Sequence, residues 1–275
     1  MKRTTYIILG MLLAGLVVIC GGIFYTSTLF TDWNDGFMNI AGEQKTVQLP
    51  ECRVVQLTAD RDVIATSNDG ETKEIRMVAF NELSLSVRPI QTTNGTFTYT
   101  SDMDKYMTMS TSGDTLHIVF NFSKEKLEKK FQDMSWLNVR SKEMILALPA
   151  DIQRITSNLT SQQVSFENLD CDTLSFAVEN RATIENCRFR ALHVINGNLN
   201  FDSGEVKDLH LRLDNIHSWH VNKESFSIDT EYLYAHGNPR CTIEKGECRQ
   251  VIWMPQSSGA TLNINLREAA KIVME

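Results

Sequence analysis

Short apolar segments recur along the second half of the chain at nearly regular intervals. The clearest is Leu174-Ser175-Phe176, in which one polar residue separates two apolar ones. Similar triplets begin at Leu192, Leu209, Tyr232 and Val251, and an earlier copy begins at Ile152. Alternation of this kind indicates strands, and a repeat of about one coil indicates a β-solenoid, in which each coil covers the apolar side of the next.

The first and third residues of each triplet are predicted to face the core of this solenoid, because neighbouring side chains of a strand point to opposite faces. The predicted inward positions include Leu174, Phe176, Leu192, Val194, Leu209, Leu211, Tyr232 and Tyr234. The residues between them, such as Ser175, His193 and His210, are predicted to face outward.

An asparagine follows the first apolar position at the same distance in four of the copies. These are Asn180, Asn198, Asn215 and Asn238. Asparagine tolerates left-handed backbone and bonds its own main chain, so it suits a tight corner. We therefore expect a structural ladder of corner asparagines, with a polar ligand groove as the alternative.

The pattern before the repeats predicts a second β-rich region over residues 45–149. One helix interrupts it, since Ser123 can cap residues 124–133 and Leu127, Phe131 and Met134 would share one face. The expected order is a membrane segment (1–25), a linker (26–44), this β-rich part, and a solenoid of about five to six coils with a C-terminal cap (150–275).

The N-terminus carries an uncharged segment from Tyr6 to Tyr25, preceded by Lys2 and Arg3. A helix of this length spans roughly 30 Å, the thickness of the bilayer hydrocarbon. Because positive residues stay in the cytoplasm, the rest of the chain is expected on the other side. The sequence favours a single-pass signal anchor over a cleaved signal peptide.

The net charge is -7, and the sequence contains no long run of Lys and Arg free of acidic residues. Nucleic-acid binding depends on clustered positive charge. We therefore expect no nucleic-acid partner.

Histidines provide the first candidate chemistry. His193 and His210 occupy equivalent positions on adjacent predicted coils, roughly 5 Å apart, and His217 and His220 follow shortly after. Imidazoles at this distance can bind zinc or copper. No close His or Cys spacing supports a metal here, so the preferred interpretation is exposed polar side chains without metal or cofactor.

Five cysteines follow the apolar N-terminal segment. Cys241 and Cys248 flank a possible turn, and Cys171 and Cys187 lie about one coil apart, so each pair could form a disulfide. Buried free thiols are the alternative. The aspartates of the repeats do not recur in phase, and no catalytic pattern is present, so we expect no enzymatic activity.

These parts together resemble a known group of proteins. The segments Ser112 to Ile118 and Leu146 to Pro149, followed by the repeats, are similar to the adhesin-like proteins of bacterial envelopes, including those with a head GIN domain. The resemblance implies a single-stranded right-handed β-helix in the periplasm or on the cell surface. The apparent anchor and the charged segment 124–133 depart from the family.

A membrane-anchored, extracytoplasmic binding or scaffold protein is the function that the sequence favours, because long repetitive faces suit recognition. The expected partners are the membrane, through the N-terminal helix, and an unidentified protein or glycan. An envelope sensor and a carbohydrate-active enzyme are the alternatives.

Overall fold

A computed structural model describes residues 11–22, 36–60, 63–66, 73–239, 244–245, 248–263, 265–266 and 271–274. The chain forms two compact units, residues 1–37 and 38–275. In the first unit, residues 11–22 are helical. Among the residues described, none of the helices has both the length and the apolar character needed to cross a membrane. The predicted membrane segment 6–25 continues beyond the described helix at both ends.

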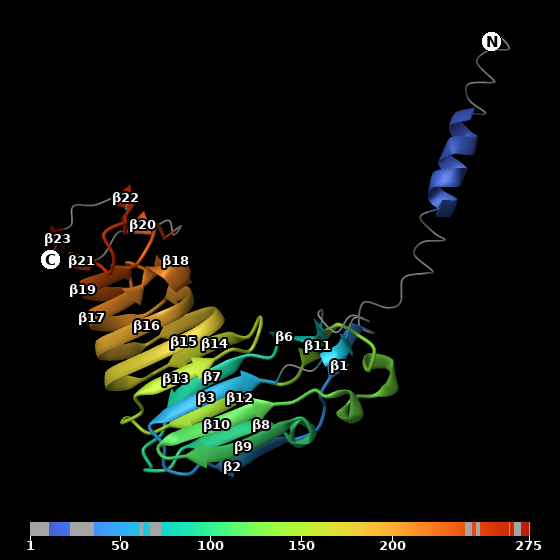
Figure 1. The fold of residues 1–275 in the computed structure, drawn as a ribbon, viewed down its shortest axis with the longest axis horizontal. Coiled ribbons are helices and arrows are strands. Elements are labelled where there is room, and N and C mark those ends of the chain that lie inside the picture. Colours follow the sequence, from blue (N-terminus) through green and yellow to red (C-terminus); the bar gives the residue numbers. More distant parts are fainter. Residues whose placement is uncertain are drawn as a thin grey trace, which may run out of the picture. The chain divides into compact units, whose positions relative to one another are not determined.

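The second unit consists mainly of strands (Figure 1). The strands of its first part are β1 (Phe37–Asn39), β2 (Gln44–Gln48), β3 (Val54–Ala59), β4 (Val63–Thr66), β5 (Lys73–Ile75), β6 (Met77–Glu82), β7 (Leu85–Pro89), β8 (Thr96–Thr100), β9 (Met107–Ser112), β10 (Thr115–Phe120), β11 (Trp136–Arg140) and β12 (Met144–Leu148). The later strands are β13 (Arg154–Ser157), β14 (Gln163–Glu167), β15 (Asp170–Glu185), β16 (Cys187–Phe201), β17 (Gly204–Arg212), β18 (Ile216–Val221), β19 (Phe226–Ala235), β20 (Glu244–Lys245), β21 (Cys248–Pro255), β22 (Asn265–Leu266) and β23 (Lys271–Met274).

The later strands pair in parallel, one on the next, in the order β13-β15-β16-β17-β19-β21-β23, which we call the parallel stack. Leu174 lies opposite Leu192, and Leu192 lies opposite Leu209, so the predicted equivalence of these three positions is confirmed. Figure 1 shows β15, β16, β17 and β19 as successive ribbons of this stack. Each turn of the chain, which we call a coil, therefore adds one strand directly beside the previous one.

The side chains inside the parallel stack follow the predicted phase as far as β17. All six predicted inward residues of β15, β16 and β17 are at most 1% exposed. In β19 the predicted phase is wrong by one residue. Glu231 and Leu233 lie opposite Leu209 and Leu211 and are fully buried. Tyr232 and Tyr234 face outward and are half-buried. The equivalent of Leu209 in β19 is therefore Glu231 and not Tyr232.

The predicted helix over residues 124–133 is wrong. Two short 3-10 segments, η3 (Lys124–Lys126) and η4 (Lys129–Phe131), replace it, and extended backbone at Leu127 and Glu128 separates them. The buried guanidinium of Arg76 donates hydrogen bonds to the carbonyls of Phe131, Gln132 and Met134. A distant side chain thus bonds three carbonyls of this segment, and the Phe131 carbonyl also accepts a hydrogen bond from the Met134 amide (3.3 Å).

Strand pairing crosses residue 149 and joins the β-rich first part to the parallel stack. Strand β3 pairs with β10 on one side and with β13 on the other, and β7 pairs with both β12 and β14. One cluster of buried apolar residues extends from Met38 to Trp253. The β-rich first part and the parallel stack therefore share one core.

The four predicted corner asparagines do not form a ladder. Asn198 lies opposite Arg181 and Ser218 and not opposite another of these asparagines. Among the described non-glycine residues, positive φ angles occur at Asn168 (57°), Asn186 (50°) and Ser161. Asn186 Nδ2 donates a 2.7 Å hydrogen bond to Asn168 Oδ1 on the neighbouring coil. The left-handed corner thus precedes the apolar triplet, whereas Asn180 and Asn198 lie within strands and Asn215 ends a 3-10 segment.

Cys171 and Cys187 form no disulfide, which agrees with the second interpretation, buried free thiols. Both thiols are free and buried. Cys171 lies opposite Phe189, and Cys187 lies opposite Gly204, so the two cysteines are out of register on their neighbouring strands. Burial raises the pKa of each thiol to about 11. Cys241 and the side chain of Cys248 lie outside the described residues.

Candidate functional site

Outward side chains of the parallel stack form a continuous row on one face. Arg154, Ser175, His193, His210 and Tyr232 lie opposite one another on β13, β15, β16, β17 and β19. Neighbouring strands are about 4.8 Å apart, so side chains at matching positions are in contact distance. We call these five residues the outward row.

Three rings of the outward row stack face to face. The ring centroids of His193 and His210 are 4.2 Å apart with an interplanar angle of 16°, and those of His210 and Tyr232 are 4.5 Å apart at 7°. The predicted proximity of His193 and His210 is confirmed. Because Tyr232 faces outward, it extends the stack, and His210 has a ring on each side.

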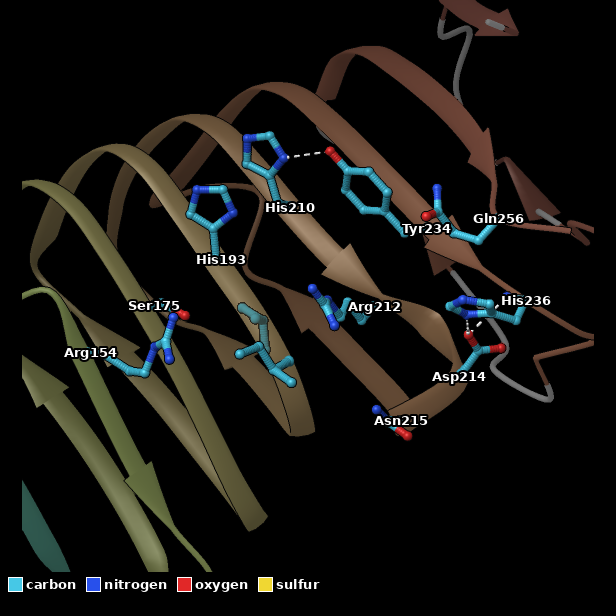
Figure 2. Close-up of a pocket in the computed structure, with 12 residues that line it drawn as sticks. Arg154, Ser175, His193, His210, Arg212, Asp214, Asn215, Tyr234, His236 and Gln256 are labelled. Atoms are coloured by element: carbon cyan, nitrogen blue, oxygen red, sulfur yellow. Dashed lines mark hydrogen bonds and ion pairs between the residues drawn. The ribbon is translucent and has the colours of Figure 1, made fainter. Parts of the chain in front are cut away.

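The stacked imidazoles are held in their neutral form. Burial lowers the pKa of His210 to about 4, with a further contribution from His193. Burial, followed by the charge of Arg212, also lowers the pKa of His193. His210 Nδ1 is 2.9 Å from the hydroxyl of Tyr234, which fixes the orientation of the ring (Figure 2).

A groove of about 1000 Å³ runs beside the outward row. Figure 2 shows Arg154 and Ser175 at one end, His193 and His210 along it, and Tyr234, His236 and Gln256 at the other end. The groove is lined by hydroxyl, amide, imidazole and guanidinium groups, by the carboxylate of Asp214, and by the apolar side chains of Val194 and Ile195. It therefore offers many hydrogen-bonding partners spread over several coils.

Asp214 closes one end of the groove through bonds to the following coil. Its carboxylate accepts hydrogen bonds from the backbone amide of His236 (2.8 Å) and of Gly237 (3.3 Å) and lies 3.0 Å from His236 Nδ1. Burial alone would raise the pKa of Asp214, but these hydrogen bonds outweigh burial and lower it. The ionised carboxylate of Asp214 thus holds the backbone corner at His236 through these hydrogen bonds.

Two arginines of the groove differ from most of the other described arginines. Arg88, Arg140, Arg188, Arg190 and Arg249 each form an ion pair with a carboxylate. Arg154 and Arg212 are exposed, and no carboxylate of the described residues lies within ion-pair distance of either. The groove therefore presents two uncompensated positive charges on a protein whose net charge is -7.

The structure does not bring His220 to the His193–His210 pair. His220 lies on β18 opposite Asn200, in a different part of the coil from His193 and His210, and the side chain of His217 lies outside the described residues. Within the part of the chain that the structure describes, no group of three His, Cys, Asp or Glu side chains is placed to hold a metal ion.

Sequence reasoning missed several residues of the groove. Arg154 lies opposite Ser175 on the preceding coil, so the repeat itself could have located it. Tyr234 was missed because of the phase error in β19. His236 and Gln256 directly follow the ends of β19 and β21, where the sequence pattern gives no direction for a side chain.

No family model and no curated protein matches this chain. Among solved structures, it is similar to a "putative adhesin" of Bacteroides fragilis, with 11% identity, a TM-score of 0.44, and coverage of 86% of this chain and 97% of that one. It is also similar to a "putative lipid binding protein" of Parabacteroides distasonis, with 10% identity, a TM-score of 0.38, and coverage of 86% and 99%.

Proposed function

We propose that this chain is a non-catalytic binding protein whose ligand lies in the groove beside the outward row. The observation that carries the proposal is the ordered stack of His193, His210 and Tyr232 next to two arginines without carboxylate partners among the described residues. Rings fixed by stacking on parallel strands are preorganised, so a ligand does not have to order them.

The chemistry of the outward row supports binding over catalysis. A general base needs a pKa near the working pH, and the pKa of His210 is about 4. Its Nδ1 is already engaged by Tyr234. The Asp214–His236 pair is the arrangement that would favour a hydrolase instead, and its imidazole is 74% exposed, so it is accessible to water. The experiment below therefore includes a search for product.

We also propose that the parallel stack is a right-handed β-solenoid and that residues 6–25 hold it on the extracytoplasmic side of a bacterial membrane. The in-register parallel pairing of successive coils supports the first statement. The uncharged segment preceded by Lys2 and Arg3 supports the second. A reporter fused after residue 44 should be active only outside the cytoplasm; activity in the cytoplasm would contradict the anchoring.

The binding proposal is tested with the full chain and a panel of neutral and acidic oligosaccharides. Ser175→Trp fills the space beside His193, and Ser227→Trp places the same ring on an exposed position of β19 outside the groove. We expect binding by calorimetry, weakened at least about tenfold by Ser175→Trp and unchanged by Ser227→Trp.

Two results would overturn the proposal. One is that no member of the panel binds, or that both tryptophan variants weaken binding equally, because the groove would then have no special role. The other is conversion of a bound saccharide to a new product, measured by mass spectrometry, with loss of turnover in His236→Gln. That result would favour catalysis by the Asp214–His236 pair.

A further inference from the structure

The stack of rings has one open end. His210 is covered on its two faces by His193 and Tyr232. His193 is covered by His210 on one side, and on the other side its register partner is Ser175, whose side chain is too small to cover an imidazole. One face of the His193 ring is therefore available to a ligand.

Arg154 stands on the far side of this opening. It lies opposite Ser175 on β13, so Arg154 and His193 are two strand spacings apart, about 9.6 Å along the stack. Figure 2 shows Arg154 beside Ser175, with His193 on the next coil. A flat, non-polar ring face fits against His193, and an anionic group on the same ring would then meet the guanidinium.

The two arginines of the groove favour a negatively charged ligand. Arg154 and Arg212 have no carboxylate partner among the described residues, whereas Asp214 is bonded to the amides of His236 and Gly237. Guanidinium groups bind carboxylates through two parallel hydrogen bonds, which adds both strength and geometric selectivity. A ligand carboxylate would supply the kind of partner that neighbouring acidic residues supply to Arg88, Arg188 and Arg190.

The spacing of Arg154 and Arg212 favours an extended ligand. Arg212 lies just beyond His210 on β17, and His210 lies three coils beyond Arg154, so about 14 Å of the stack separates them. Both arginines line the same groove. An oligomer with repeated carboxylates is better suited than a single small acid to reach two positions three strand spacings apart.

We propose that the groove binds an acidic oligosaccharide, with one uronic acid ring packed on the open face of His193 and its carboxylate on Arg154, and a second carboxylate of the same ligand on Arg212. Hydroxyl groups of the sugars would bond to Ser175, Tyr234 and Gln256. This inference rests on the proposed function, since it specifies the ligand of the same groove.

The test uses the full chain and an oligomer of galacturonate long enough to reach both arginines. The matched neutral probe is the same oligomer with its carboxyl groups reduced to alcohols. We expect the acidic oligomer to bind at least about tenfold more tightly than the reduced one. Arg154→Gln and Arg212→Gln should each weaken binding of the acid by about tenfold and leave binding of the neutral oligomer unchanged.

Arg181→Gln is the matched control, because Arg181 is also exposed and without an ion pair among the described residues but lies outside the groove. It should bind the acid as the unaltered chain does. Equal binding of the acidic and neutral oligomers, abolished by Ser175→Trp, would overturn the acidic specificity and leave the binding function intact. Equal weakening by all three arginine variants would also overturn it. If neither oligomer nor any other saccharide tested binds, both the binding function and the acidic-oligosaccharide proposal are overturned. If only acidic peptides bind, the acidic-oligosaccharide proposal is overturned.

Discussion

His210 shows how the parallel stack changes the chemistry of a single residue. An imidazole in water is partly charged at neutral pH. Between His193 and Tyr232 it loses solvent on both faces, and the resulting burial lowers its pKa to about 4. The residue is therefore a neutral ring and a hydrogen-bonding partner of Tyr234 over most of the physiological range.

This shift predicts how stability depends on pH. The pKa of His210 is lower in the folded chain than the ordinary value of 6.5, so between pH 6.5 and about 4 the unfolded state binds more protons. The free energy of unfolding should therefore fall as the pH is lowered through this range and be unaffected by His210 above it. His210→Gln should make this fall shallower.

Urea denaturation between about pH 4.5 and 7.5 measures the effect. His220→Gln is the control, because His220 is exposed on β18 and lies outside the outward row. The fall in the free energy of unfolding should be shallower in His210→Gln than in His220→Gln. If the free energy of unfolding depends on pH identically in His210→Gln and in the unaltered chain, the stacked imidazole does not contribute to that dependence.

The residues of the site could be predicted only where they share the repeat. His193 and His210 occupy the same position of consecutive triplets, and their contact follows from the regular step between Leu192 and Leu209. The positions of Tyr234 and His236 could be predicted only with the correct inward and outward assignment in β19. The triplet beginning at Tyr232 shifts that assignment by one residue. Both tyrosines resemble core residues, whereas Glu231, which a hydropathy pattern places outside, is fully buried.

At the scale of elements, the coils are determined by the alternation of residues and by their corners. The steps across β15, β16 and β17 could be predicted because Leu174, Leu192 and Leu209 repeat cleanly. The helix over 124–133 was predicted from local spacing alone. Its carbonyls are bonded by Arg76, which lies far earlier in the chain, and no local pattern reports such a contact.

The corner at Gly204 gives a prediction about backbone conformation. Its φ is 128°, and a Cβ there would lie 2.1 Å from the carbonyl oxygen of Cys187 on the previous coil. Gly204→Ala should therefore lower the free energy of unfolding by roughly 3 kcal/mol or more, since both backbone strain and a backbone clash result.

Gly113→Ala is the matched comparison for this corner. Gly113 also has a positive φ, 60°, but its Cβ would meet no atom within 4 Å. Its cost should be about 1 kcal/mol, from conformation alone. Chemical denaturation of the two variants measures the difference, and equal costs would mean that the close approach of neighbouring coils at Gly204 is not limiting.

At the scale of the whole second unit, the shared core decides how the chain unfolds. Stacked repeats can lose coils one by one, because each contacts only its neighbours. Here, however, β3 and β7 of the first part pair directly with β13 and β14. The first coils of the parallel stack are therefore bonded to the β-rich part as well as to one another.

We accordingly predict a single unfolding transition for the β-rich part and the coils up to β16. In urea, the backbone amides of β7 and β16 should lose protection from hydrogen exchange at the same midpoint. Leu146→Ala removes a fully buried side chain of β12 and should lower the free energy of unfolding by about 2–5 kcal/mol, shifting both midpoints equally. Ser165→Ala on β14, which removes a partly exposed hydroxyl, should shift neither by a comparable amount. If β16 stayed protected in Leu146→Ala after β7 had exchanged, the parallel stack would be an independent folding unit and the shared core would not couple the two parts.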